Sequence, residues 1–162
     1  METTILGIVA TSLPYVVKVV TYAQDWAGSS ITWVAEGNNR KSLEWKLDGV
    51  FGSLACHTGI HEWIDRRVIY NLVPATTGLH PSLDAAFVCA MMEEARSDIL
   101  CVGEMDVNGN MVPLEYPLQV GRLAVELGLP VIVPAASAPY VALAGGVVYA
   151  AKDVVELTAA IG

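Results

Sequence analysis

The first part of the chain is a series of short apolar runs separated by polar and glycine-rich connections. Residues 5–11, 15–22 and 30–35 are rich in Ile, Val and aromatic side chains. Such residues fit the half-buried surface of a pleated sheet, and the stretch 24–29 between the last two runs has the composition of a connection. We therefore predict three strands in this part of the chain.

A longer repeat follows, with apolar residues three and four positions apart. Leu43, Leu47, Val50 and Leu54 share one face of a helix. This spacing predicts a helix over residues 39–56, with an asparagine at its start as the cap.

From residue 66 onward, strand and helix patterns alternate. The predicted strands are 66–73, 99–105, 111–114, 129–133 and 147–150. The predicted helices are 81–96, 117–127, a short one between the last two strands, and 152–161. Asn108-Gly109 is typical of a tight hairpin turn, so we expect 111–114 to return antiparallel. In helix 117–127, the side chains expected to face inward are Val120, Leu123, Ala124 and Leu127.

Strands first, then alternating helices and strands, predict one α/β (α+β) domain over residues 1–162. Apolar residues make up 54% of the chain and charged residues 16%, which favours a buried core over disorder. The stretch 127–151 contains no charged residue. Pro130, Pro134 and Pro139 interrupt it, however, and lipid cannot satisfy the backbone groups they free. We therefore expect strand, helix and strand here, not a membrane span.

Charge and cysteine content restrict the function further. The net charge of −8 argues against a nucleic-acid partner, since phosphate binding needs a basic surface. So little charge predicts that a partner, or another copy of the chain, covers some apolar surface. Cys56, Cys89 and Cys101 have no metal-type spacing and indicate reduced thiols, and the N-terminus lacks the basic region of a signal peptide. We expect a cytoplasmic protein.

Two motifs suggest cofactors, and both are incomplete. Residues 37–42 end in Lys-Ser like a phosphate-binding loop, but Ala35 and Arg40 stand where that loop needs glycines. Cys56, His57 and His61 are weak candidate metal ligands close together in sequence. A local cluster of this kind is more often a polar loop. We therefore predict no bound nucleotide, cofactor or metal.

Ser82 is the one candidate nucleophile. It follows Pro81 at a predicted helix start, where a serine is usually a cap whose oxygen accepts a backbone N–H. A nucleophilic serine needs a base within reach of its hydroxyl. His80 is the nearest in sequence, but we expect the intervening Pro81 to keep it away. The fold could instead bring His57 or His61 close.

Small signals spread over nearly the whole chain resemble a known superfamily. One set is similar to the C-terminal part of the Lon protease domain: Val102-Gly103-Glu104, Gly109, Pro113, Leu118, Ala124, Gly128 and residues 131–134. A second set resembles the N-terminal domain of Mg-chelatase-like ATPases of the ComM type: residues 70–75 (YNLVPA) and 81–84 (PSLD). The resemblance implies a mixed sheet like that of ribosomal protein S5 domain 2.

The resemblance also indicates which catalytic residues and which module of the family this chain lacks. Pro81-Ser82 matches the Pro-Ser of Lon's nucleophile, but the position of Lon's catalytic lysine is taken by Val120, and the lysine before it by Leu118. An apolar side chain cannot accept the serine proton, and Arg122 nearby stays protonated. Asp84 also replaces a glycine of the Lon pattern. The chain has no P-loop, so we expect a stand-alone domain without the relatives' ATPase module.

We therefore expect a non-catalytic Lon/Mg-chelatase-like domain that acts as a self-assembling scaffold or docks to a protein partner. The family habit favours a homo-oligomer, a hexameric ring. Two alternatives stay open. One is a divergent serine peptidase or hydrolase that uses Ser82, and the other is an accessory subunit of a separate AAA+ or RecA-like ATPase.

Overall fold

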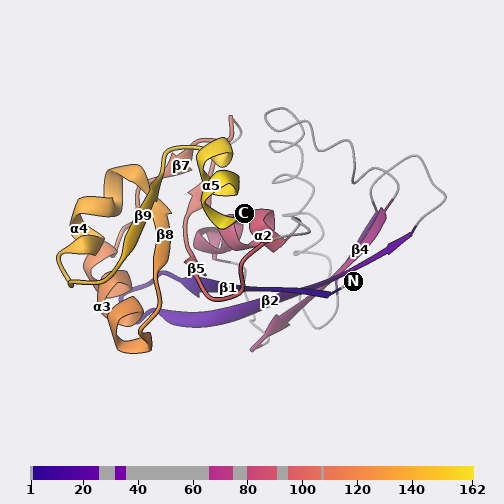
Figure 1. The fold of residues 1–162 in the computed structure, drawn as a ribbon, viewed down its shortest axis with the longest axis horizontal. Coiled ribbons are helices and arrows are strands. Elements are labelled where there is room, and N and C mark those ends of the chain that lie inside the picture. Colours follow the sequence, from indigo (N-terminus) through magenta and orange to yellow (C-terminus); the bar gives the residue numbers. More distant parts are fainter. Residues whose placement is uncertain (1, 26–31, 36–65, 75–79, 91–94, 107) are drawn as a thin grey trace.

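The computed structural model describes residues 2–25, 32–35, 66–74, 80–90, 95–106 and 108–162 (Figure 1). These residues form a mixed α/β structure, as predicted. The strands are β1 (Glu2–Val9), β2 (Tyr15–Asp25), β3 (Thr32–Ala35), β4 (Arg66–Val73), β5 (Leu100–Cys101), β6 (Glu104–Met105), β7 (Met111–Val112), β8 (Val131–Pro134) and β9 (Val148–Ala151). The helices are α2 (Asp84–Ala90), α3 (Pro117–Leu127), α4 (Ala138–Ala142) and α5 (Val154–Ile161), with 3₁₀ turns η2 (Pro81–Leu83) and η3 (Ala135–Ser137).

The main sheet is mixed: β2 forms the antiparallel pairs, and the remaining pairs, including β3 with β4, are parallel. Its strand order is β3-β4-β2-β1-β5-β8-β9. Strand β2 lies antiparallel to both β1 and β4, whereas β1, β5, β8 and β9 run parallel to one another. The hairpin β6–β7 forms a separate small sheet. The candidate site lies where β1 and β5 meet.

Alternating side chains of the sheet enter two separate cores. Ile5, Cys101 and Ile132 pack with helices α2 and α5 on one face. Leu100 and Val131 pack with α3 and α4 on the other. Helices therefore cover both faces of the sheet around β5 and β8 (Figure 1), and this explains the continuous apolar run of β8, whose residues are all buried.

Most elements of the second half match the prediction. Helix 117–127 has the predicted bounds, the hairpin after Met105 is antiparallel, and the uncharged stretch 127–151 forms β8, a short helix and β9. Within the part of the chain that the structure describes, no helix is long and apolar enough to cross a membrane.

Three details were wrong. The single strand predicted over 99–105 is two short strands in different sheets, because the backbone turns at Gly103, whose φ is +147°. The helix that starts near Pro81 does not reach Arg96, since Ala95 and Arg96 are not helical. Leu127, predicted to face inward, is 45% exposed, although Val120 and Ala124 are buried.

Some predictions fall outside the described residues. These are the helix over 39–56, the loop-like motif at 37–42, and the three weak metal candidates Cys56, His57 and His61.

Candidate functional site

Ser82 lies in the turn η2, directly before helix α2. Pro81 takes the first position of the turn, where its missing N–H costs nothing. The side chain of His80 caps the turn, because the N–H of Ser82 donates to His80 Nδ1 at 3.1 Å. The prediction that Ser82 caps its own helix is therefore wrong: that part is played by His80.

The Ser82 hydroxyl instead joins the turn to the end of β1. Its Oγ donates to the carbonyl oxygen of Ile8 and accepts from the N–H of Ala10, both at 2.9 Å. The side chain is buried, with 4% of its surface exposed. The oxygen does accept a backbone N–H, as predicted, but from a residue 72 positions away. No local sequence pattern announces such a contact.

Main-chain and carboxylate bonds complete this connection. Gly103 donates its N–H to Ser82 O at 2.8 Å and accepts at its own oxygen from the N–H of Ala85 at 3.0 Å. Asp84, also buried, accepts from the N–H of Met105 at 3.1 Å. We call this group the Ser82 junction: the start of α2 bonded through Ser82 and Asp84 to the end of β1 and to the β5–β6 connection.

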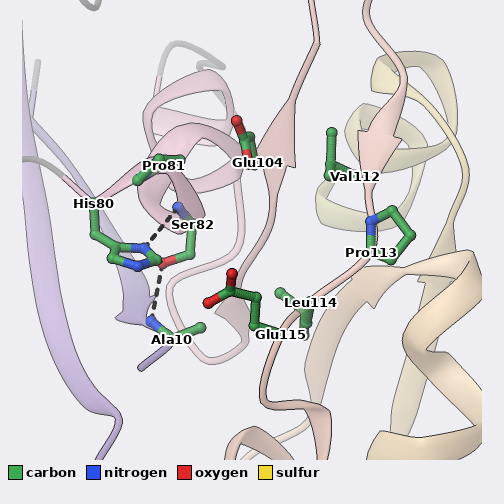
Figure 2. A pocket seen from close by; sticks show the side chains of 9 residues that line it. All are labelled: Ala10, His80, Pro81, Ser82, Glu104, Val112, Pro113, Leu114 and Glu115. Atoms are coloured by element: carbon green, nitrogen blue, oxygen red, sulfur yellow. Dashed lines mark hydrogen bonds between the residues drawn. The ribbon is translucent and has the colours of Figure 1, made fainter. Parts of the chain in front are cut away.

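A pocket of about 330 Å³ opens beside the junction. Figure 2 shows His80 and Ser82 on one wall, with Glu104 and Glu115 on the other side. Leu114 also lines it, and its N–H donates to the buried Ser137 Oγ at 2.8 Å, which fixes this wall. Both glutamates are exposed. The sequence analysis missed them as site residues, since isolated acidic residues beside turns are common on any surface.

The expectation that Pro81 keeps His80 away from Ser82 is wrong. His80 Nδ1 lies 2.7 Å from Ser82 Oγ, despite the intervening Pro81 (Figure 2). Nδ1 already accepts the Ser82 N–H, so the ring proton is on Nε2 and Nδ1 is a proton acceptor. The hydroxyl has one proton and two acceptors in reach, Nδ1 and the oxygen of Ile8.

The two positions that correspond to the lysines of Lon in the sequence comparison, Leu118 and Val120, lie away from the pocket. Val120 is fully buried in the core between α3 and the sheet, and neither it nor Leu118 is among the residues that line the pocket. Leu118 is 40% exposed. The apolar residue at position 120 is therefore part of the hydrophobic core.

Two cysteines lie in the core, Cys89 on α2 and Cys101 on β5. Cys89 and Cys101 are free thiols, both buried. Burial raises the pKa of the Cys89 thiol well above its usual range, and the adjacent Cys101 raises it further. The Cys89 thiol therefore stays protonated and is a poor nucleophile near neutral pH. Among the described residues, no group of three His, Cys, Asp or Glu side chains could hold a metal ion.

The chain was also compared with known proteins. No protein-family model matches it, and no curated protein matches it. The similarity to Lon and Mg-chelatase-like domains therefore stays a prediction from the residues quoted above.

Proposed function

We propose that this protein is a non-catalytic assembly module, related to the Lon and Mg-chelatase-like domains, that works in the cytoplasm by self-association and by docking to another protein. Closed homo-oligomers are the common outcome of self-association. The hexamer is the form that the resemblance favours.

One observation carries the proposal: large apolar side chains are exposed on neighbouring elements of the C-terminal half. Helix α4 packs against both α3 and β9. The exposed residues on and beside these three elements are Leu118, Val125, Leu127, Tyr140, Leu143, Val147 and Tyr149. The most exposed of them, Leu143, is 73% accessible. Apolar surface of this kind marks a protein–protein contact more often than an accident of sequence.

The geometry of Ser82 supports the non-catalytic part. Its oxygen is buried and shared among the end of β1 and His80. A catalytic serine presents its oxygen to the substrate, whereas this hydroxyl is used to hold β1 and α2 together. The two free thiols support the cytoplasmic assignment, since cysteines stay reduced there.

Sedimentation velocity on the pure protein, over concentrations up to tens of micromolar as a rough upper range for modest interfaces, tests the proposal. We expect a species larger than one chain. A monomer over the whole range, together with no retained partner in a pull-down, would contradict it.

A serine hydrolase is the second candidate, favoured by the 2.7 Å contact between His80 Nδ1 and Ser82 Oγ beside a pocket. In that reaction Oγ would bond to a substrate carbonyl carbon, and its proton would pass to Nδ1 and then to the leaving group. The bond to Ile8 would have to break as the proton moved.

A fluorophosphonate probe distinguishes the two candidates. The hydrolase predicts labelling of the wild-type protein, none of Ser82→Ala, and strongly reduced labelling of His80→Gln. The assembly module predicts no labelling of any of the three, with an ester or peptide substrate as the independent check. Ser12→Ala, an exposed serine beside the β1–β2 turn, is the matched control.

A further inference from the structure

The outer edge of strand β9 is open. It is the last strand in the sheet order, and in the described part of the chain only β8 pairs with it. In that pairing Val131 lies opposite Val148, and Val131 N–H bonds to the oxygen of Val147. Backbone groups alternate along a parallel strand, so Val147, Tyr149 and Ala151 face β8. The N–H and C=O groups of Val148 and Ala150 therefore face outward.

The open stretch has definite limits. Further along the same edge, the oxygen of Lys152 accepts from Met111 N–H at 2.9 Å, and its N–H donates to Glu156 Oε1 at 3.0 Å. The backbone groups at Lys152 are therefore occupied. Before the strand, Gly145 and Gly146 have no side chains. Only a short strand, centred on Tyr149, can be added here.

Edge strands of monomeric proteins usually carry features that prevent pairing, such as lysine, proline or a bulge. Strand β9 has none of these: its sequence is Val-Tyr-Ala-Ala, and it lies in the uncharged stretch 127–151. Val147 and Tyr149 are 59% and 43% exposed. Tyr140 of the adjacent α4 and Leu143, which follows that helix, are exposed as well, at 57% and 73%.

We propose that β9 pairs antiparallel with β9 of a second copy of this chain, about a two-fold axis at Tyr149. Val148 of each copy then lies opposite Ala150 of the other, and all of the outward backbone groups of these residues are used, in about four hydrogen bonds. The two Tyr149 side chains become the close, non-hydrogen-bonded pair at the axis. This inference rests on the proposed function and names the surface through which the copies meet.

A second copy fits this edge better than an unrelated strand for two reasons. The pairing is self-complementary, since the axis at Tyr149 lets the same outward groups of Val148 and Ala150 bond in both copies, and it ends at Gly146, opposite the occupied Lys152 of the other copy. Charge close to the edge also does little to oppose the contact. Each chain carries −8, but the charged groups nearest this edge are paired within the chain, Arg96 with Asp98 at 3.1 Å and Lys152 with Glu156 at 4.0 Å.

The pairing is isologous, so by itself it gives a dimer. A hexamer needs a further three-fold contact on another surface. The order of assembly is then testable, because a change at Tyr149 should reduce a hexamer to trimers and a dimer to monomers.

Two experiments test the inference, the first by sedimentation. Tyr149→Lys puts two positive charges at the axis, beside Arg96, and we expect at least tenfold weaker association. Leu13→Lys adds the same charge to an 83% exposed leucine in the β1–β2 turn and should leave association unchanged. An unchanged oligomer in Tyr149→Lys overturns this inference but not the proposed function. A wild-type monomer overturns this inference, and it overturns the proposed function as well if the pull-down retains no partner.

The second experiment tests the register by disulfide cross-linking. It uses a Cys56→Ser background, in which the two remaining native thiols, Cys89 and Cys101, are buried. Across the axis the two Tyr149 Cα atoms are about 4.5 Å apart, within disulfide range. Tyr149→Cys should therefore oxidise rapidly to a cross-linked dimer. Val147 is more exposed than Tyr149, but in this register the two Val147 residues of the dimer are offset by four residues, about 13 Å along the strands. Val147→Cys should therefore not form the cross-link. Equal cross-linking of both variants, or of neither, contradicts the proposed pairing.

Discussion

The Ser82 junction and the β9 edge use their polar groups in opposite ways. At the junction, a hydroxyl and a carboxylate are bonded to backbone groups from distant parts of the chain, and an imidazole accepts from the nearby Ser82 N–H. At the edge, the backbone groups of Val148 and Ala150 face outward, and the side chains around them are apolar and exposed. The comparison teaches that residue types associated with catalysis can be structural. In the proposed function, the capacity to bind lies in a segment without any chemical motif.

The two regions should therefore respond differently to substitution. Changes at the junction should lower the free energy of unfolding, because Ser82 and Asp84 are buried and a lost bond there leaves a buried group unsatisfied. Changes at the edge should leave unfolding nearly unaffected and alter association. The following predictions test this contrast, from the largest expected effect on unfolding to the smallest.

Gly103→Ala should be the most damaging single substitution. A Cβ at this position would lie 2.5 Å from Met111 Cε and 3.1 Å from Pro134 Cγ, and the φ of +147° is one that alanine rarely adopts. We expect a loss of about 2–4 kcal/mol in the free energy of unfolding, measured by urea denaturation. Gly128→Ala is the control: its φ is also positive, at +67°, but nothing lies within 4 Å. Equal losses in the two variants would mean that crowding at Gly103 is unimportant.

Ser82→Ala should come second. The substitution removes the bonds to Ile8 and Ala10 and leaves the buried Ala10 N–H without its acceptor. One unsatisfied buried group costs about 1–3 kcal/mol, and we expect a loss of about 2 kcal/mol. This exceeds a lost helix cap, which the sequence alone suggested. Ser12→Ala, at an exposed position, should change stability by less than about 0.5 kcal/mol. If Ser82→Ala is equally harmless, the junction is not held by this hydroxyl.

The sequence predicted most of this fold because its signals are local. Helix 117–127 has Pro117 at its start and a glycine after its end, and the Asn108-Gly109 turn fixes the hairpin, so both were found. The break at Gly103 was missed because glycine tolerates many conformations, and only the neighbouring Met111 and Pro134 show why no other residue fits.

The candidate site was predictable only in part. Ser82 was singled out from the Pro-Ser pair, but its partners Ile8 and Ala10 are more than 70 residues away. The sequence predicts that His80 cannot reach the hydroxyl, because Pro81 stands between the two residues. In the structure the same proline turns the chain so that His80 Nδ1 faces both Ser82 N and Ser82 Oγ. The open edge was not predictable, since strand order depends on contacts between distant segments.

The buried thiol of Cys89 gives a pH-dependent prediction for the interior. Its pKa in the folded protein is raised above the ordinary value of about 8.5, so the folded protein keeps a proton that the unfolded chain loses. Stability is therefore unaffected well below that value. It falls as the pH rises above it, by up to about 1.4 kcal/mol per pH unit until the folded pKa is reached.

Urea denaturation between neutral and alkaline pH measures this loss. Cys89→Ala should make the fall in the free energy of unfolding with pH less steep, by up to the contribution of one proton, about 1.4 kcal/mol per pH unit. Val88→Ala, which deletes a neighbouring buried side chain, should lower stability at every pH and keep the wild-type slope. Identical slopes in the wild-type protein and Cys89→Ala would show that Cys89 does not control the alkaline transition.

Leu143→Lys should have the smallest effect on unfolding, and it tests the other side of the comparison. Leu143 follows helix α4 and is 73% exposed, so the substitution removes little buried surface. We expect the free energy of unfolding at low protein concentration to change by less than about 0.5 kcal/mol. At high concentration the wild-type protein gains stability from association, because a partner that binds only the folded state raises its apparent stability. Leu143→Lys should lose that gain.

The measurement is the melting temperature over a hundredfold range of protein concentration. The wild-type melting temperature should rise with concentration, while that of Leu143→Lys should stay nearly flat and meet the wild-type value at the dilute end. The matched variant Leu13→Lys, with a side chain even more exposed, should follow the wild-type curve. A lower melting temperature for Leu143→Lys at the dilute end would place Leu143 in the fold of the single chain. The contrast between the β9 edge and the Ser82 junction would then fail, because both regions would stabilise the fold of the single chain.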